Sequence, residues 1–321
     1  MHDPLWRGGT VWSLVFGERD EDAALELLND LCSVAVGSGI DAKLFGETSV
    51  GVVFGLRLTD GRRIVAKAHQ PRERVDFLLA VYDTQSSLHG AGFPCPLPLA
   101  TPLAFGAAHA TFEELVDEGT FEDARDPVIR GALAETLAWH LTLTKRLGVP
   151  VGFEGGWRVW DSTSVWPAET HSPIFDFPGT AAGAEWIDDL ARAARQRFVA
   201  GEPQVGHSDW GAKHFRFVDG SVQIVSDWDS LSGQSEEQLV GTAAGTFTAN
   251  PALHDGASLR RARTRCGRSS MSTAPRETRL YRAPNDYRST LRPHISSRTP
   301  PAASTPSVRT ATSARHSASS D

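Results

Sequence analysis

Cysteine is scarce in this sequence: only Cys32, Cys95 and Cys266 occur among 321 residues. This odd number of distant cysteines excludes a disulfide framework and the short spacings of a zinc site, and it fits a reducing compartment. No run of about 18 apolar residues is present, so we expect no membrane span. The N-terminus has no basic segment followed by an apolar stretch, so no secretory signal is recognisable and we expect a cytoplasmic protein. The Gly-x-Ser-x-Gly and His-Glu-x-x-His motifs of hydrolases and zinc peptidases are also missing.

The last part of the chain, 251–321, lacks both lysine and tryptophan. It carries 13 Arg against 4 acidic residues, a balance of +9, which leaves −16 for residues 1–250 within the total of −7. Its Arg, Ser, Thr, Pro and Ala show no apolar periodicity, so we expect a disordered tail. A nucleic-acid-binding arm is disfavoured, because the arginines are scattered without aromatic platforms. An altered reading frame is a second hypothesis, since the composition changes abruptly near Asn250.

The first 250 residues change from strand-like to helix-like periodicity along the chain. Apolar residues alternate with polar ones in 44–67 around an Asp60-Gly61 turn, which predicts a hairpin. A polar crossing at Glu113–Gly119 follows, and it suggests an α+β fold of two lobes, 1–116 and 117–250, with a ligand cleft between them. Helices are expected at 20–36, 74–89, 127–146, 181–198 and 236–248. In the fourth of these, we expect the apolar side chains to face inward, namely Trp186, Ile187, Leu190 and Ala194.

Residues 205–229 combine acidic side chains with a second hairpin signal. Phe215 and Phe217 alternate with a polar residue, and Asp219-Gly220 is a typical hairpin turn. Such a hairpin brings its outer ends together, so carboxylates from both sides should converge. These are Asp209, Asp227 and Asp229. Because like charges repel, a divalent cation or an incoming proton is the usual reason to gather them.

Lys67 ends an apolar strand in a chain with very few lysines before the tail. It is either an edge lysine whose stem packs along the strand or a point charge for a phosphate. Upstream, Gly46–Gly51 is a flexible turn that either contacts phosphate or is only a turn. This segment is not a P-loop, because Val52 stands where that motif has its lysine.

Three motif segments together resemble the catalytic core of the aminoglycoside phosphotransferase family, small-molecule kinases with the protein-kinase-like fold. They are His207-Ser-Asp209, His214 five residues after that Asp, and the strand Ile224-Val-Ser-Asp227-Trp-Asp229. The family pattern is His-Gly-Asp, Asn five positions later, and a hydrophobic strand ending in Asp-x-Asp or Asp-x-x. The resemblance spans 44–248. It implies a two-lobed protein-kinase-like fold with a small β-rich N-lobe and a helical C-lobe.

The resemblance also implies roles for the converging residues. Asp209 would orient and deprotonate an acceptor hydroxyl, and His207 would brace its loop. Asp227 would bind the Mg²⁺ that bridges the nucleotide phosphates, and Asp229 would assist the metal or the acceptor. Lys67 would neutralise phosphate charge.

The remaining nucleotide contacts implied by the resemblance are less specific. The glycine turn, through Gly46 and Gly51, would lie near the phosphates, and Lys213 could also reach them. Backbone groups from Glu114 to Val116 would pair with adenine.

Ser208 stands where the family pattern has Gly, which is a mild departure, and two further departures affect this site. His214 replaces a metal-binding Asn, and imidazole is a softer ligand that Mg²⁺ uses less readily, so His214 could instead bond a phosphate oxygen or hold Asp209. The acid that should pair with Lys67 is not obvious, and Glu73 and Asp76 are the candidates.

The resemblance implies a phosphotransferase that moves the γ-phosphate of ATP to a hydroxyl of a small polar molecule, such as an aminoglycoside, a sugar or an amino alcohol. The alternative is a catalytically impaired kinase-fold protein that only binds nucleotide or ligand. An acidic, aromatic stretch at 157–189 is either an acceptor-binding wall or core plus solvated surface. The oligomeric state is left open.

Overall fold

The computed structural model describes residues 10–153, 182–199 and 201–248. The predicted tail at 251–321 and most of the stretch at 157–189 lie outside the described residues. All of the described residues belong to one compact unit, Met1–Pro275.

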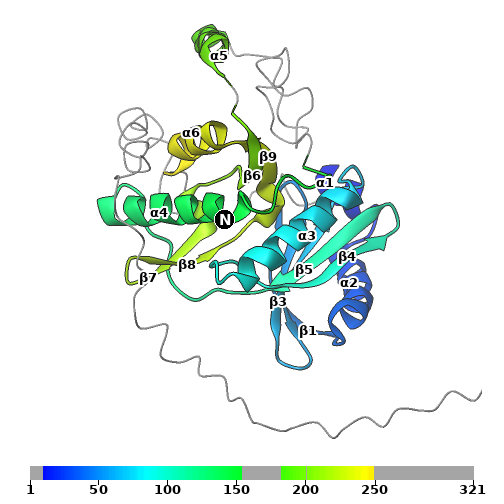
Figure 1. Cartoon of the computed structure of the whole chain (residues 1–321). Helices are drawn as coiled ribbons and strands as arrows, with labels where there is room; N and C mark the ends of the chain where they lie inside the picture. The colour runs from blue at the N-terminus through cyan, green and yellow to red at the C-terminus, as the bar shows by residue number, and fades with distance from the viewer. Residues whose placement is uncertain (1–9, 154–181, 200, 249–321) are drawn as a thin grey trace, which may run out of the picture. The chain divides into compact units, whose positions relative to one another are not determined.

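The N-terminal part is a five-stranded antiparallel sheet in the order β1-β2-β3-β5-β4 (Figure 1). Helices α1 (Thr10–Phe16) and α2 (Glu21–Val36) contribute to its core. The α2 helix begins after Asp20, whose side chain accepts a hydrogen bond from the Ala23 amide, as an N-cap does. The strands are β1 (Ile40–Thr48), β2 (Val52–Leu58), β3 (Arg63–His69), β4 (Pro98–Phe105) and β5 (Ala108–Glu114).

Side-chain alternation gives the two faces of this sheet different chemistry. In β3, Ile64, Ala66 and Ala68 belong to the core that the sheet shares with α1 and α2. Because successive side chains of a strand point to opposite faces, Lys67 and His69 face the other way. The sheet therefore presents an apolar face to α1 and α2 and a partly polar face elsewhere.

A second hydrophobic core lies in the C-terminal part and defines a second lobe. Its largest buried side chains include Trp210 and Trp228. Residues of α3 (Val75–Gly90) also belong to this core, among them Val81 and Leu88, so this helix packs beyond the sheet. The other elements are α4 (Pro127–Thr144), β6 (Pro203–His207), β7 (Phe215–Val218), β8 (Ser221–Val225), β9 (Leu231–Ser235) and α6 (Glu236–Thr246).

The hairpin predicted within 205–229 is present as β7 and β8. Asp219 and Gly220 have φ values of 50° and 77°, so both central turn residues adopt the left-handed conformation that a tight hairpin turn requires. Strands β6 and β9, which pair antiparallel with each other outside this hairpin, were not expected from the sequence. Each has only five residues, too few for a clear periodic signal.

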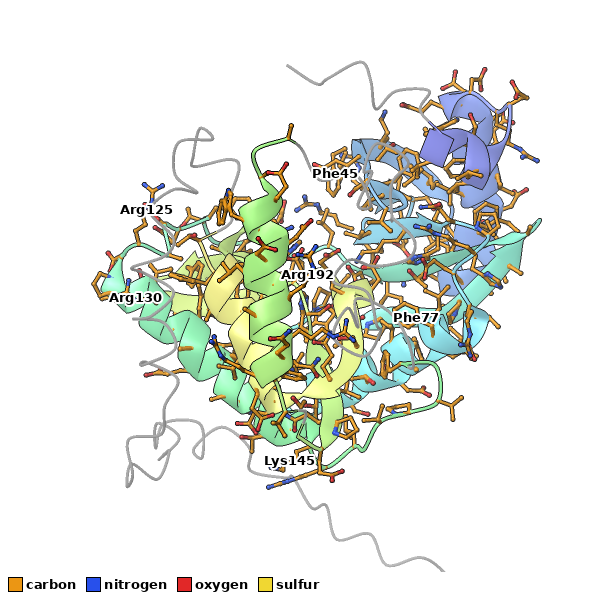
Figure 2. All side chains as sticks on the ribbon, turned by 90° about the horizontal axis from the view of Figure 1, so that it is seen from above. Phe45, Phe77, Arg125, Arg130, Lys145 and Arg192 are labelled. Carbon is orange, nitrogen blue, oxygen red and sulfur yellow. The ribbon has the colours of Figure 1, made fainter. Side chains whose placement is uncertain are left out.

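The expectation that helix α5 (Glu185–Arg197) turns its apolar residues inward is wrong. None of its residues is buried, and Trp186 and Leu190 are 63% and 60% exposed. Arg192, labelled in Figure 2, forms an ion pair with Asp189 on the same helix. Periodicity determines which side chains share a helix face, but it does not determine whether another element covers that face.

Among the described helices, none combines the length and the apolar character needed to cross a membrane.

His140 of α4 lies fully buried beneath the loop that follows β6. Its Nε2 atom accepts a hydrogen bond from the backbone amide of His207, 3.2 Å away. Its ring stacks on that of Trp210 with 5.6 Å between centroids and an interplanar angle of 24°. Burial lowers the pKa of His140 to about 3, so the ring stays neutral in the folded protein.

We expect the free energy of unfolding to fall as the pH is lowered from 7 to 5. The unfolded chain binds a proton at His140 with a pKa near 6.5, whereas the folded chain does not, so acid favours unfolding. At pH 5 this amounts to about 2 kcal/mol for His140. Urea denaturation at both pH values measures the loss. His140→Gln keeps an acceptor near Nε2 without a titrating ring and should lose less; an equal loss in both proteins would contradict the prediction.

Candidate active site

Two short antiparallel ladders bring the acidic loops together. The β6–β9 ladder pairs His207 with Leu231, and the β7–β8 ladder pairs Phe215 with Val225. The loops between these ladders therefore begin and end side by side. Hydrogen bonds close them at both ends: the Ser208 amide donates to the Ser230 carbonyl, and the Ser226 amide donates to the His214 carbonyl, both at 2.9 Å.

Asp209, His214 and Asp227 form a cluster of potential cation ligands between these loops. The His214 Nε2 atom lies 3.0 Å from an oxygen of Asp209 and 3.5 Å from an oxygen of Asp227. One ligand atom from each of the three lies within 4.8 Å of the others. Two hard carboxylate oxygens and one imidazole nitrogen suit a divalent cation. The geometry thus brings together three candidate site residues of the sequence, and His214 lies against both aspartates.

Asp227 has a left-handed backbone with φ of 71°. Such a conformation costs a residue with a Cβ about 1–2 kcal/mol, although Asp tolerates it better than most. The turn continues into a 3₁₀ helix, η3 (Trp228–Ser230), and the Ser230 hydroxyl donates to Asp227 Oδ2 at 2.9 Å. Strained backbone of this kind is frequent at functional sites. In this conformation the Asp227 carboxylate lies 3.5 Å from His214.

Asp209 is held in its ionised form by two cationic or hydrogen-bonding neighbours. The Lys213 ammonium lies 2.7 Å from its Oδ2 atom, and His214 shares the same oxygen. Burial would raise the pKa of Asp209, but the hydrogen bonds from His214 and Lys213 outweigh it and hold this pKa below its usual range. The carboxylate is consequently oriented and charged at neutral pH.

His207 braces both loops from beneath. Its Nδ1 atom accepts a hydrogen bond from the Asp209 amide at 3.2 Å, so its protonated Nε2 atom donates to the Ser226 carbonyl at 3.0 Å. The residue is 1% exposed, and burial, followed by the nearby His214, lowers its pKa to about 4. The resemblance implies a bracing role for His207 during catalysis, and that role stays a prediction.

Lys67 reaches the loops from β3 and meets three carboxylates. Its Nζ atom lies 2.7 Å from Asp229, 3.7 Å from Asp227 and 3.8 Å from Glu113. Burial would lower the pKa of Lys67, but these three acids raise it above its usual value. Asp229 therefore lies outside the cation cluster and serves in this structure as the nearest partner of Lys67.

The acids expected to pair with Lys67 were not the right ones. Asp76 pairs with Arg74, and Glu73 lies 4.0 Å from Arg72. Glu113, expected from the sequence only as part of the crossing between the lobes, is the partner supplied by the sheet. Alternate residues of β5 share one face of the sheet, so the position of Glu113 in β5 indicates its face. This indicates a contact with Lys67 only when the pairing of β5 with β3 is known.

The glycine turn and the crossing segment have structural partners of their own. A Cβ atom on Gly51 would lie 2.6 Å from the Ala68 carbonyl oxygen, so close approach to β3 requires glycine there. Gly46 pairs with Phe54 across the β1–β2 ladder. The Glu114 amide already donates to the Leu97 carbonyl. Phosphate and adenine contacts in these segments, including Val116, therefore stay predictions.

A small cavity of about 30 Å³ adjoins Lys67 on the side of α3. Its walls include Lys67, His69, Tyr82, Gln85, Glu113 and Asp229.

No family model and no curated protein matches the chain by sequence. The structure nevertheless has a protein-kinase-like fold, which confirms the expected fold class. One similar structure is amicoumacin kinase hAmiN, with a TM-score of 0.55 and 12% identity over 79% of this chain and 78% of that one.

Two further structures match less well. Aminoglycoside-3'-phosphotransferase of type VIII gives a TM-score of 0.49 at 17% identity, over 77% of this chain and 90% of that one. Aminoglycoside phosphotransferase APH(3'')-Id from Streptomyces rimosus gives 0.48 at 19% identity, over 80% and 93%. At these identities the likeness concerns the fold and leaves the reaction of this chain to its own residues.

We expect the cluster of Asp209, His214 and Asp227 to bind Mn²⁺ added to the purified protein. Asp227→Asn should weaken this binding about tenfold or more, because it removes the charge of a ligand while keeping the shape of the side chain. Electron paramagnetic resonance of free Mn²⁺ measures the affinity. Asp41→Asn, which removes an exposed carboxylate that pairs with Arg57, is the matched control. Equal affinities of the two variants would show that the cation does not bind at this cluster.

Proposed function

We propose that this chain is a phosphotransferase that moves the γ-phosphate of ATP to a hydroxyl group of a small polar molecule. The convergence of Asp209, Asp227 and Lys67 carries the proposal. Lys67 comes from the N-terminal sheet and the two aspartates come from loops of the other lobe, yet Lys67 lies within 3.7 Å of Asp227. Phosphoryl transfer depends on positioning and charge stabilisation, and it needs a phosphate-binding lysine, a metal-binding carboxylate and a carboxylate at the nucleophile.

Asp227 and His214 are the residues that would hold a Mg²⁺ ion, with water completing its coordination. When bound, such an ion neutralises charge on the nucleotide phosphates. The structure of amicoumacin kinase contains AMP-PNP and Ca²⁺, which supports nucleotide and divalent-metal use by this fold. Lys67 would contact a phosphate oxygen, and Lys213 would add positive charge beside Asp209. Backbone groups near Val116 would pair with adenine, and the turn of Gly46 and Gly51 would lie over the phosphates.

Asp209 would accept a hydrogen bond from the acceptor hydroxyl and aim its oxygen at the γ-phosphate. Because its pKa is held low by His214 and Lys213, it is a weak base in the resting protein. The hydroxyl proton would therefore move to Asp209 late, when bond formation to phosphorus has made that proton acidic. Orientation of the nucleophile is accordingly the larger contribution expected from Asp209.

The acceptor class proposed is an aminoglycoside-like molecule, a sugar or an amino alcohol. The net charge of −16 for residues 1–250 supports an amine-bearing acceptor, because an acidic surface attracts cations. The boundaries proposed for the two lobes are 1–116 and 117–250.

A second candidate function is nucleotide or ligand binding without phosphate transfer. It is favoured by one contact: Lys67 lies 2.7 Å from Asp229, so a phosphate must displace this ion pair before the lysine can act. A chain in which that exchange is too costly would bind nucleotide weakly and transfer nothing.

We expect the purified chain to phosphorylate at least one member of a panel of aminoglycosides, sugars and amino alcohols in the presence of Mg²⁺ and ATP. Asp209→Asn should lower the rate about 10²–10⁴-fold, the range for loss of an acid–base group, in a protein that still binds nucleotide. Radiolabelled phosphate transfer and calorimetry supply the two measurements. A wild-type chain that binds ATP yet is as inert as Asp209→Asn on every acceptor would favour the binding-only function instead.

A further inference from the structure

Lys67 and Glu113 lie on the same face of the N-terminal sheet because of the β3–β5 register. These strands are antiparallel neighbours in which Lys67 is opposite Thr111 and Val65 is opposite Glu113. Lys67 and Glu113 are therefore diagonal neighbours on one face, a separation that two long side chains can bridge. The acid and the lysine are held by adjacent strands of one sheet.

Glu113 is fixed more firmly than the other two acids around Lys67. It is 8% exposed, and its Oε2 atom accepts a hydrogen bond of 2.9 Å from the Gln85 side-chain amide of α3. Gln85 is itself 3% exposed, and the same nitrogen donates to the Pro96 carbonyl at 2.9 Å. The other oxygen, Oε1, is thereby directed toward Lys67 at 3.8 Å.

Asp227 and Asp229 are more accessible and lie in the loop that would meet the nucleotide. Their side chains are 35% and 28% exposed, against 11% for Glu113. A cation at Asp227 would neutralise that carboxylate, and a phosphate at Lys67 would displace Asp229. A buried ammonium that loses its partners is costly, so one acid must stay with it throughout. Glu113 is the acid whose position does not depend on the loop.

We propose that Glu113 is the permanent partner of Lys67, that it positions the ammonium for a nucleotide phosphate, and that Gln85 holds Glu113 in place. This role deepens the proposed function and rests on it. In protein kinases the strand lysine pairs with a glutamate on a helix, so the pair depends on the position of that helix. Here the ion pair is contained in the sheet, and α3 supplies only a neutral amide. The lysine is thus kept in place without requiring an acid from α3.

The test compares two ligands, AMP-PNP with Mg²⁺ and adenosine, whose affinities are measured by calorimetry on the full chain. Glu113→Gln removes the charge but keeps the shape and an acceptor for Gln85. We expect it to weaken AMP-PNP binding about tenfold and to leave adenosine binding unchanged, since adenosine has no phosphate for Lys67. In a Lys67→Met background, Glu113→Gln should cause no further loss, because the two residues act together.

Two more variants separate positioning from general damage. Gln85→Met removes the hydrogen bond to Glu113 but leaves the charge of Glu113 in place. It should weaken AMP-PNP binding about threefold. Asp83→Asn, an exposed change on the same helix, should bind both ligands like the wild type. Three results would overturn the role of Glu113. Glu113→Gln could bind AMP-PNP as tightly as the wild type, or its affinity for adenosine could fall as much as its affinity for AMP-PNP. The third is that Glu113→Gln weakens AMP-PNP binding by the same factor in the Lys67→Met background as in the wild type. If the wild-type chain binds AMP-PNP no more tightly than adenosine, the role of Glu113 is wrong. If it binds neither ligand, the proposed function is wrong as well.

Discussion

Burying the ammonium group of Lys67 costs free energy that only nearby carboxylates can offset, and the rest of the site is arranged around this requirement. Three acids surround the ammonium, and they come from two different lobes. The attraction works in both directions, because the half-buried Asp229 has its pKa lowered by Lys67 against the effect of desolvation. Lys67 and Asp229 thus each offset the free-energy cost of keeping the other charged where water has little access. A phosphate that enters the site would join an existing balance of charges rather than meet an isolated lysine.

The backbone supports that balance through strand pairing more than through helices. Two ladders, β6–β9 and β7–β8, fix the loops that carry Asp209 and Asp227, and His207 joins the loops from below. The β3–β5 ladder fixes Lys67 relative to Glu113. A hydrogen-bonded ladder fixes which residues lie opposite each other, because a slip by one residue would turn every side chain to the other face of the sheet.

The cation cluster differs from the family pattern at one position, His214. The structure shows which groups the His214 side chain contacts. The imidazole is a potential ligand, yet it also shares an oxygen of Asp209 with Lys213. Any cation at the cluster therefore competes with a proton and with an ammonium for the same carboxylate. The chain shares its fold with amicoumacin kinase, but a fold does not determine the charges of a site, which depend on the individual side chains.

Local signals in the sequence were sufficient to predict the hairpin at Asp219-Gly220, the helices α2, α3, α4 and α6, and the convergence of Asp209 with Asp227. Each depends on residues close together in the chain, so propensity and periodicity determine it. The partners of Lys67 were decided by the tertiary structure, because Glu113 reaches it only through the β3–β5 register. The exposed apolar face of α5 was likewise decided there, since a periodic pattern does not say what covers it. The sequence by itself identified Lys67 and the three aspartates as candidate site residues. Only the packing of distant strands added Glu113 and determined which of these groups meet, because ion pairs depend on separation in space.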